Sequence, residues 1–150
     1  MELLLPELVF AHVRVNTADE VLHFLANKLQ VNGKVKNTFE NAVMKREKIH
    51  PTGLPSGKIA VAIPHTDVQY VNEAAIAFAT LDHPIPFHNM AETQKILDVQ
   101  IVVMLALKDP HSQVKMLQKL MTLFQNQKLL SDLQKLTDSQ ELYQIVSKHI

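Results

Sequence analysis

The chain has 150 residues, of which 47% are hydrophobic and 20% are charged, a composition typical of a globular domain and unlike that of a disordered protein. Fifteen Lys and Arg residues balance fifteen Asp and Glu residues, so no basic excess exists to attract nucleic acid or an anionic membrane. Cysteine is absent, which excludes disulfides, thiol catalysis and thiolate metal sites. We expect residues 1–150 to form a single domain.

Neither a targeting segment nor a common nucleotide-binding loop is expected. Residues 1–7 carry Glu2 and Glu7 where a signal peptide needs basic residues. The most apolar run, residues 101–107, is far shorter than the ~20 residues that a membrane span requires. The few glycines form neither GxGxxG nor GxxxxGK[ST]. We therefore predict a cytoplasmic protein without a cofactor.

The first half of the chain begins with a predicted strand at residues 8–15, which are rich in β-branched side chains. Thr17 and Glu20 form a capping-box pattern that predicts the start of a helix, because each side chain can bind the backbone amide of the other. The same signal predicts a second helix over residues 37–49. Residues 50–57, with two prolines and two glycines, are predicted to be a loop without regular structure.

The second half contains three apolar segments that predict strands, at residues 58–63, 74–81 and 99–107. Their nearly continuous apolarity indicates burial on both faces, as in a sheet covered by helices. Residues 82–92, with two prolines, are expected to include a turn or an edge segment. Helices are predicted from residue 112, at 128–136 and at 139–149, which makes the fold class α/β. On the helix from residue 112, helical spacing predicts one buried face, formed by Val114, Leu117, Leu120, Met121 and Phe124.

His65 is the first candidate for chemistry because the strand at residues 58–63 runs directly into Pro64 and His65. Proline fixes the direction in which the chain leaves the strand, and ligands of open α/β sheets bind beyond the carboxyl ends of the strands. A neutral imidazole with a pKa of about 6.5 is a nucleophile near neutral pH. His65 is therefore a candidate nucleophile, and the alternative is a histidine that only caps the strand.

Two other residues could support such a nucleophile. His111 follows the strand at residues 99–107, and it would reach the same sheet edge as His65 if the two preceding strands are parallel neighbours. There it could donate a hydrogen bond to an anion forming on His65, beside the positive amides of a helix start. Arg46 lies near the end of the second helix and offers a planar fork that matches phosphoryl oxygens or carboxylates. The alternative for both His111 and Arg46 is that they are solvent-exposed residues at helix ends without a functional role.

A metal site is not expected. His83 and His88 are separated by proline-rich sequence and have no nearby cysteine, so they make a poor zinc pattern. A metal-dependent hydrolase that uses His65, Asp67 and His111 is an alternative, but this ligand spacing matches no usual metal site. Nucleic-acid binding is disfavoured by the neutral charge and the aromatic content of 5%.

The chain resembles a known family in three motifs. These are Arg46-Glu47, then Pro51-Thr52-Gly53, then the apolar segment 59–63 that ends in Pro64-His65. Together they resemble the enzyme IIA domains of the bacterial phosphotransferase system for sugar transport, in the fructose/mannitol superfamily. The resemblance extends over nearly the whole chain. It implies a mixed central sheet flanked by helices on both faces.

The resemblance also implies roles for individual residues. His65 matches the family histidine that accepts a phosphoryl group from the carrier protein HPr and passes it to a IIB component. Arg46 matches an arginine that helps to hold phosphoryl or partner charge, and His111 looks like a second active-site histidine. Thr66 stands where family members often have glycine, and its hydroxyl could donate to a phosphoryl oxygen. The membrane is reached only indirectly, through the IIC transporter.

The sugar and the biological role stay open in the sequence. The spacing between Arg46 and His65 and the Pro-Thr-Gly motif are closer to galactitol-type members, whereas His111 is closer to the mannitol and fructose pattern. Galactitol is the favoured sugar. A regulatory module that is phosphorylated on His65 and signals to other proteins is the alternative function.

Overall fold

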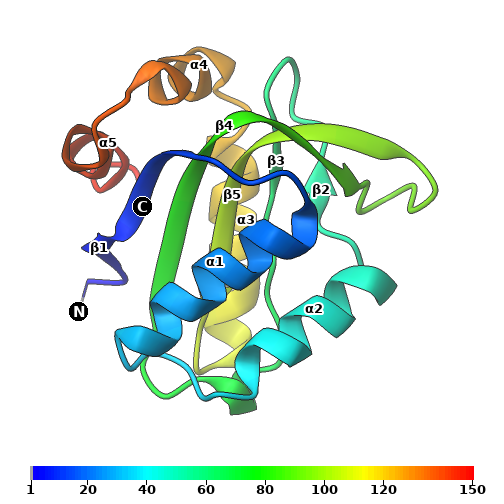
Figure 1. Cartoon of the computed structure of the whole chain (residues 1–150), viewed down its shortest axis with the longest axis vertical. Helices are drawn as coiled ribbons and strands as arrows, with labels where there is room; N and C mark the ends of the chain where they lie inside the picture. The colour runs from blue at the N-terminus through cyan, green and yellow to red at the C-terminus, as the bar shows by residue number, and fades with distance from the viewer. Residues whose placement is uncertain (1) are drawn as a thin grey trace.

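A mixed five-stranded sheet between two layers of helices forms the fold of residues 2–150, which a computed structural model describes (Figure 1). The strand order is β1-β4-β5-β3-β2. The pairs β1/β4 and β3/β5 are parallel, and the pairs β4/β5 and β2/β3 are antiparallel. The α/β class and the mixed sheet are therefore confirmed. The strands are β1 (Leu4–Val13), β2 (Gly53–Leu54), β3 (Ala60–Ala62), β4 (Ala75–His88) and β5 (Ile96–Ala106).

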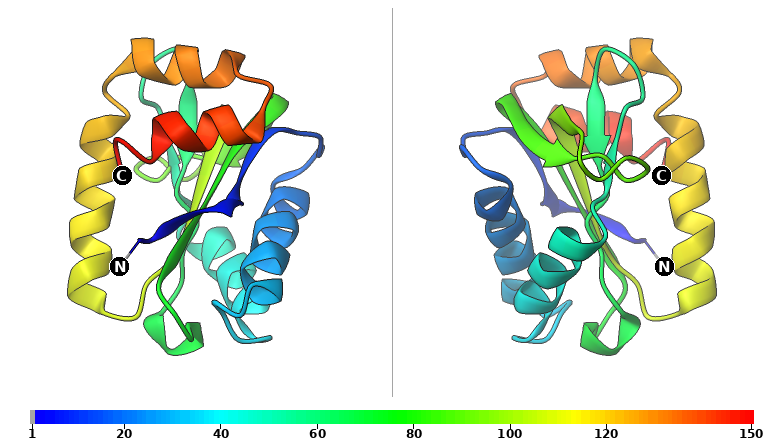
Figure 2. Two further views of the ribbon diagram at one scale, coloured as in Figure 1. Left: turned by 90° about the vertical axis from the view of Figure 1, so that its left-hand side faces the viewer. Right: turned by 90° about the vertical axis from the view of Figure 1, so that its right-hand side faces the viewer.

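The helices cover the two faces of the sheet unequally. One face lies under α1 (Ala18–Val31) and α2 (Phe39–Ile49), and the other lies under α3 (Pro110–Leu123), α4 (Gln127–Lys135) and α5 (Ser139–Val146) (Figure 2). A short 3₁₀ helix, η1 (Val68–Tyr70), follows β3.

Two hydrophobic cores result, one on each face of the sheet. In β4, Ala75, Ala77 and Ala79 belong to the core under α1 and α2, whereas Ile76 and Phe78 belong to the core under α3 to α5. Alternate residues of a strand point to opposite faces, so burial of both faces accounts for the continuous apolar runs in the sequence.

The starts of the first two helices lie where the sequence predicts them, but their capping differs. Thr17 is the N-cap of α1, and its Oγ1 accepts a hydrogen bond of 3.1 Å from the amide of Glu20. The Glu20 carboxylate accepts from the amide of Asn16 at 3.4 Å rather than from that of Thr17. Thr38, the N-cap of α2, makes no side-chain capping bond, so burial of one helix face contributes more to this start than its cap does.

The predicted loop at residues 50–57 is wrong at Gly53 and Leu54, which form β2 and pair with Ala62 and Val61 of β3. Gly53 also lies against the β4–β5 hairpin, since its carbonyl accepts a hydrogen bond of 2.8 Å from the amide of Met90. A Cβ atom at residue 53 would stand 2.5 Å from the carbonyl oxygen of His88. The absence of a side chain is therefore what allows this loop to join the sheet.

Residues 82–92 include the predicted turn only at their end, after Asn89, because β4 continues to His88 through both prolines. Pro84 is exposed, and the register of β4 against β5 shifts between Thr80 and Ile85. Such an irregularity accommodates residues that lack an amide donor, and pairing resumes at Ile85 with Val99.

The face of α3 is less buried than the sequence predicts. Leu120 and Phe124 are buried, but Val114 is 53% exposed and Met121 is 42% exposed. The helix packs on the sheet through a narrower stripe than the apolar spacing indicates. Met116, Leu117 and Leu123 are partly buried against this core.

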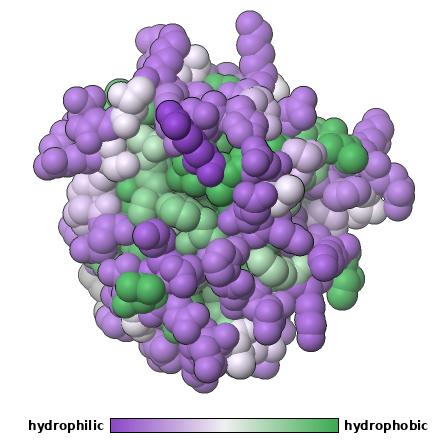
Figure 3. Space-filling view, in the orientation of Figure 1, coloured by the Kyte–Doolittle hydropathy of each residue, from purple (hydrophilic) through white to green (hydrophobic). Residues whose placement is uncertain are grey.

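The surface of the molecule on the α1 side is mostly hydrophilic, with smaller hydrophobic areas between the polar side chains (Figure 3). Within residues 2–150, none of the helices combines the length and apolarity needed to cross a bilayer.

Replacement of Gly53 by Ala tests the close approach of β2 to the hairpin. We expect Gly53→Ala to lower the free energy of unfolding by about 1–3 kcal/mol, because backbone atoms must move to admit the methyl group. Urea denaturation measures the change. The control is Gly33→Asn, since Gly33 has open space around it and asparagine tolerates its positive φ of 75°. Equal stability of Gly53→Ala and the wild-type protein would contradict the predicted clash.

Candidate functional site

His65 stands three residues after the end of β3 and is held at the carboxyl edge of the sheet. The pairing of β3 with β5 continues past the end of the strand, because the amide of Leu105 donates to the carbonyl of Pro64 at 3.0 Å. His65 itself is 6% exposed. The predicted placement of this histidine at a strand end is confirmed, and the backbone around it belongs to the sheet rather than to a free loop.

The imidazole of His65 has one engaged nitrogen and one free nitrogen. Nδ1 lies 2.8 Å from the carbonyl oxygen of Ile63. A carbonyl can only accept, so Nδ1 carries the proton and Nε2 carries the lone pair of the neutral ring. Nε2 has no hydrogen-bond partner within residues 2–150, and it is not among the buried unpartnered side-chain atoms of that region, so it reaches solvent.

The electrostatic environment keeps this ring neutral. Burial lowers the pKa of His65 below its ordinary value of 6.5, and the positive charge of Arg46 acts in the same direction. The hydrogen bond to Ile63 and the charge of Asp67 oppose this lowering only in part. At neutral pH His65 is therefore an uncharged imidazole, which is the nucleophilic form.

A pocket of about 310 Å³ opens beside this imidazole. Its wall combines the end of α2, the loop that follows α2, the β4–β5 hairpin and α3, and consists of Arg46, Ile49, His50, Pro51, Thr52, His65, Met90, Thr93 and Leu117. Much of this wall is apolar, and Ile49 is 69% exposed. His50, to which the sequence gives no role, lies in this wall because it follows directly on the last turn of α2.

Arg46 is a wall residue of this pocket and is half-buried, unlike a charged residue on a solvated helix end. Its Nε is buried and has no hydrogen-bond partner within residues 2–150. A buried donor without a partner is unfavourable, and the guanidinium group matches the geometry of phosphoryl oxygens. The wall of the pocket therefore includes a cationic side chain whose charge an anion in the pocket would balance.

Glu47 and Thr52 make a partly buried contact that the sequence does not reveal. The Glu47 carboxylate accepts hydrogen bonds of 2.8 Å from both the amide and the hydroxyl of Thr52. Burial raises the pKa of Glu47 from 4.5 to about 7, although the two bonds from Thr52 and the charges of Arg46 and His88 lower it. The only signal in the sequence is that Glu47 and Thr52 stand in adjacent motifs.

His111 lies at the expected edge but outside the pocket. The parallel pairing of β3 with β5 brings His65 and His111 to the same end of the sheet. His111 is exposed on the first turn of α3 and does not line the pocket of His65. Instead, Gln113 makes the contact from this turn, and its Nε2 donates to the carbonyl of Thr66 at 3.4 Å. A role for His111 stays a prediction.

Two further features bear on the site. Thr66 is buried next to His65, and a role for its hydroxyl stays a prediction. Gln113 Oε1 is buried without a hydrogen-bond partner in the described chain, so Arg46 Nε and Gln113 Oε1 are two unsatisfied polar atoms close to the His65 segment. The sequence analysis does not single out Gln113. Its position two residues after His111 places it in the first turn of the same helix, which is the one signal that could have indicated it.

Residues 2–150 contain no group of three or more His, Cys, Asp or Glu side chains that could hold a metal ion. His65, Asp67 and His111 therefore do not form the metal centre that a hydrolase would need. The histidines His83 and His88 do not belong to such a group either.

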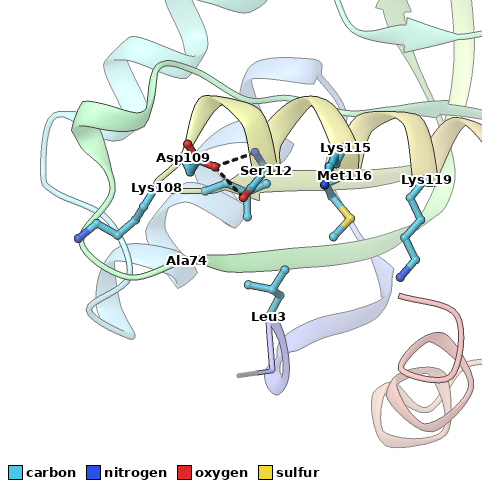
Figure 4. A pocket seen from close by; sticks show the side chains of 9 residues that line it. Leu3, Ala74, Lys108, Asp109, Ser112, Lys115, Met116 and Lys119 are labelled. Atoms are coloured by element: carbon cyan, nitrogen blue, oxygen red, sulfur yellow. Dashed lines mark hydrogen bonds between the residues drawn. The ribbon is translucent and has the colours of Figure 1, made fainter.

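A second pocket, of about 380 Å³, lies beside the start of α3 (Figure 4). Asp109 caps this helix by accepting hydrogen bonds from the amide and hydroxyl of Ser112, at 3.1 and 3.0 Å. Leu3 and Met116 contribute apolar wall, and neither His65 nor Arg46 lines the pocket. Of these two pockets, only the pocket of His65 contains both the nucleophilic histidine and Arg46 in its wall.

Comparisons with known proteins show the family of the chain. The model of the family described as phosphoenolpyruvate-dependent sugar phosphotransferase system, EIIA 2, matches residues 2–149. The galactitol-specific EIIA component of Escherichia coli K12 is 28% identical over 121 residues, which cover 81% of this chain and 80% of that protein. Multiphosphoryl transfer protein 1 of the same strain is 34% identical over 107 residues, 70% of this chain, but the match spans only 12% of that longer protein.

Solved structures show the same fold. The mannitol enzyme IIA of Escherichia coli, solved in a complex with phosphorylated mannitol enzyme IIB, has a TM-score of 0.76 and 22% identity over 95% of each chain. The nitrogen regulatory protein IIA-Ntr of Neisseria meningitidis has a TM-score of 0.73 and 19% identity over 96% of each chain. At these identities the similarity is one of fold.

The protonation of His65 can be followed by NMR. We expect the ring resonances of His65 to titrate with a midpoint below 6.5, because burial and the charge of Arg46 disfavour the imidazolium form. In the Arg46→Ala variant the midpoint should move upward, since one of the two causes is removed. A wild-type midpoint at or above 6.5 would contradict the neutral-imidazole assignment.

The raised pKa of Glu47 predicts a pH-dependent stability. The folded protein holds this proton more tightly than the unfolded chain, so the contribution to stability is full below pH 4.5 and is lost as the pH rises through about 7. Glu47→Gln cannot ionise and keeps the size of the side chain. We expect it to be more stable than the wild type by up to about 3 kcal/mol at pH 8, and the gain to shrink toward pH 4.5. Urea denaturation at pH 8 and pH 4.5 provides the test, and a gain independent of pH would contradict it.

Proposed function

Because the chain belongs to the EIIA 2 family of the phosphoenolpyruvate-dependent sugar phosphotransferase system, we propose that His65 accepts a phosphoryl group from phosphorylated HPr and passes it to a IIB component. The family comprises phosphotransferase components, and a phosphocarrier role in sugar transport follows from membership. One observation carries the assignment to His65. It is a neutral imidazole with a free Nε2, in a pocket whose wall also includes the cationic side chain of Arg46.

The transfer is an in-line displacement at phosphorus. Nε2 of His65 attacks the phosphoryl group of a phosphohistidine on HPr, and the new N–P bond forms as the old one breaks. The electron pair of the broken bond returns to the donor imidazole. Nδ1 of His65 keeps its proton, so the ring becomes positively charged, and the carbonyl of Ile63 at 2.8 Å stabilises that charge. Transfer to IIB repeats the displacement from the opposite direction.

The residues around His65 would stabilise the transferred group. The guanidinium of Arg46, in the pocket wall, would supply positive charge and planar N–H donors for the phosphoryl oxygens. The hydroxyl of Thr66 is a second donor next to the acceptor residue. His111, exposed on the first turn of α3, would contribute only when the docked partner or the phosphoryl group brings it into reach. No nucleotide loop is required, since the donor is another phosphoprotein.

The partner would dock on apolar side chains around the pocket. Ile49 lies in the pocket wall, and Val114 and Met121 are exposed on α3, the helix whose Leu117 also lies in this wall. Exposed apolar groups of this kind mark interaction surfaces, and a small interface suits a carrier that must release each partner. The similarity in fold to a mannitol enzyme IIA solved with its phosphorylated IIB supports a IIB partner.

We assign the exchange to the cytoplasm, with contact to the membrane only through the IIC transporter. Galactitol is the favoured sugar, because the galactitol-specific EIIA component aligns with four-fifths of both chains. The similarity in fold to IIA-Ntr supports the alternative, a regulatory module that is phosphorylated on His65 but feeds no transporter.

Intact mass spectrometry tests the phosphoryl acceptor. The protein is mixed with phosphoenolpyruvate, enzyme I and HPr, and we expect a gain of one acid-labile phosphoryl group on the wild type and none on His65→Ala. Arg46→Ala should slow the gain roughly a hundredfold, as loss of one donor to a developing oxyanion does. His111→Ala should slow it less. His83→Ala, an exposed histidine of β4, is the matched control and should behave as wild type.

Phosphorylation of His65→Ala at the wild-type rate would overturn the assignment of the acceptor. The downstream partner is tested by adding galactitol-, fructose- and mannitol-type IIB components to the phosphorylated protein. Fast loss of the phosphoryl group to one of them identifies the sugar class, with galactitol expected. Retention with all three would favour the regulatory alternative.

A further inference from the structure

Glu47 is half-buried next to Arg46 of the His65 pocket, but the phosphoryl transfer described above gives it no task. We propose that Glu47 is a positioning residue that holds His65 in its reactive orientation through Thr52 and Ile63. This inference rests on the proposed function of His65 as the phosphoryl acceptor. It is carried by a continuous series of hydrogen bonds from α2 to the imidazole ring.

The first step fixes Thr52 to α2. Both carboxylate oxygens of Glu47 are used, one by the amide of Thr52 and the other by its hydroxyl, each at 2.8 Å. Thr52 is 2% exposed, so water does not compete for these bonds. Thr52 lies between Pro51 and Gly53, where the chain passes from the end of α2 into β2. The pairing of β2 with β3 holds the segment after Thr52, and the two bonds from Glu47 hold it at Thr52 itself.

The second step connects Thr52 to the residue before the Pro-His pair. The amide of Ile63 donates to the carbonyl of Thr52 at 3.3 Å, and the carbonyl of Ile63 accepts from Nδ1 of His65 at 2.8 Å. Both backbone groups of Ile63 are thus held, one on the side of α2 and one by the ring. On the β5 side, the amide of Leu105 holds the carbonyl of Pro64.

The consequence is a single orientation and tautomer for the imidazole. While the Ile63 carbonyl is fixed, Nδ1 has an acceptor at hydrogen-bond distance and keeps its proton, which leaves the lone pair on Nε2. If the Thr52 segment is released, Ile63 loses the partner of its amide and its carbonyl can turn away. The ring can then rotate or exchange its proton between the two nitrogens, and fewer molecules present Nε2 for in-line attack.

Four variants at pH 8 separate positioning from general stability. Glu47→Ala removes both bonds to Thr52, and Thr52→Val removes the hydroxyl but keeps the amide. In Glu47→Gln, the amide oxygen can still accept a hydrogen bond from the amide of Thr52, and the amide NH₂ can donate one to its hydroxyl. This conservative variant should therefore keep the position of Thr52. Asn41→Ala changes an exposed residue of the same helix and is the matched control.

Two measurements are made on each variant. The first is the rate of phosphoryl transfer from phosphorylated HPr, and the second is the pair of ¹⁵N chemical shifts of the His65 ring, which report the tautomer without any partner. We expect Glu47→Ala to react about tenfold or more slowly and to lose the predominance of the Nδ1-protonated form. Thr52→Val should change in the same direction to a smaller extent. Glu47→Gln and Asn41→Ala should stay within about twofold of wild type in rate, with the wild-type tautomer.

The outcomes that overturn the proposal are distinct. A folded Glu47→Ala protein that keeps the wild-type tautomer of His65 overturns the proposal, whatever its rate of phosphoryl transfer. A slower transfer without a change of tautomer would mean that Glu47 acts in partner docking. If Glu47→Ala does not fold, the tautomer of Thr52→Val decides in the same way. Absence of phosphorylation of the wild type would reject the proposed function, whereas the ring shifts would still show whether Glu47 positions His65.

Discussion

The hydrogen bond from Nδ1 of His65 to the carbonyl of Ile63 is the interaction on which the rest of the site depends. It is local, because the two residues stand on either side of Pro64, and it decides which nitrogen of the ring is free. Its geometry requires a fixed peptide backbone at the end of β3. The sheet supplies that backbone, since Leu105 of β5 holds the segment on one side and Thr52 holds it on the other.

The two helix layers give this strand end different surroundings. From one layer, α2 brings the cation Arg46 to the pocket of the ring, and the carboxylate of the neighbouring Glu47 binds Thr52. From the other layer, α3 brings Gln113 to the backbone of Thr66 and leaves apolar side chains in solvent. The charge that disfavours a protonated His65 is the same charge that would attract a phosphoryl group. A single placement of Arg46 therefore serves both the nucleophile and its substrate.

The sequence predicts the local features of the site and misses those that depend on packing. A strand that ends in Pro-His is visible in one short segment, as are the capped start of α1 and the helical class of the last third of the chain. The contact of Glu47 with Thr52 cannot be read in this way, because it depends on how α2 meets the following loop. Likewise, the sequence predicts Met121 as buried, although only the packing angle of α3 decides this. The strand β4 passes through Pro84 because a register shift accommodates it.

The most direct test of the fixed His65 tautomer is to identify which ring nitrogen carries the phosphoryl group. Long-range ¹H–¹⁵N correlation spectra of the phosphorylated protein distinguish the two ring positions of a phosphohistidine. The fixed bond between Nδ1 and the Ile63 carbonyl predicts that the phosphoryl group is on Nε2 of His65, with Nδ1 still protonated. A phosphoryl group on Nδ1 would require that bond to break, and would contradict the role assigned to the end of β3.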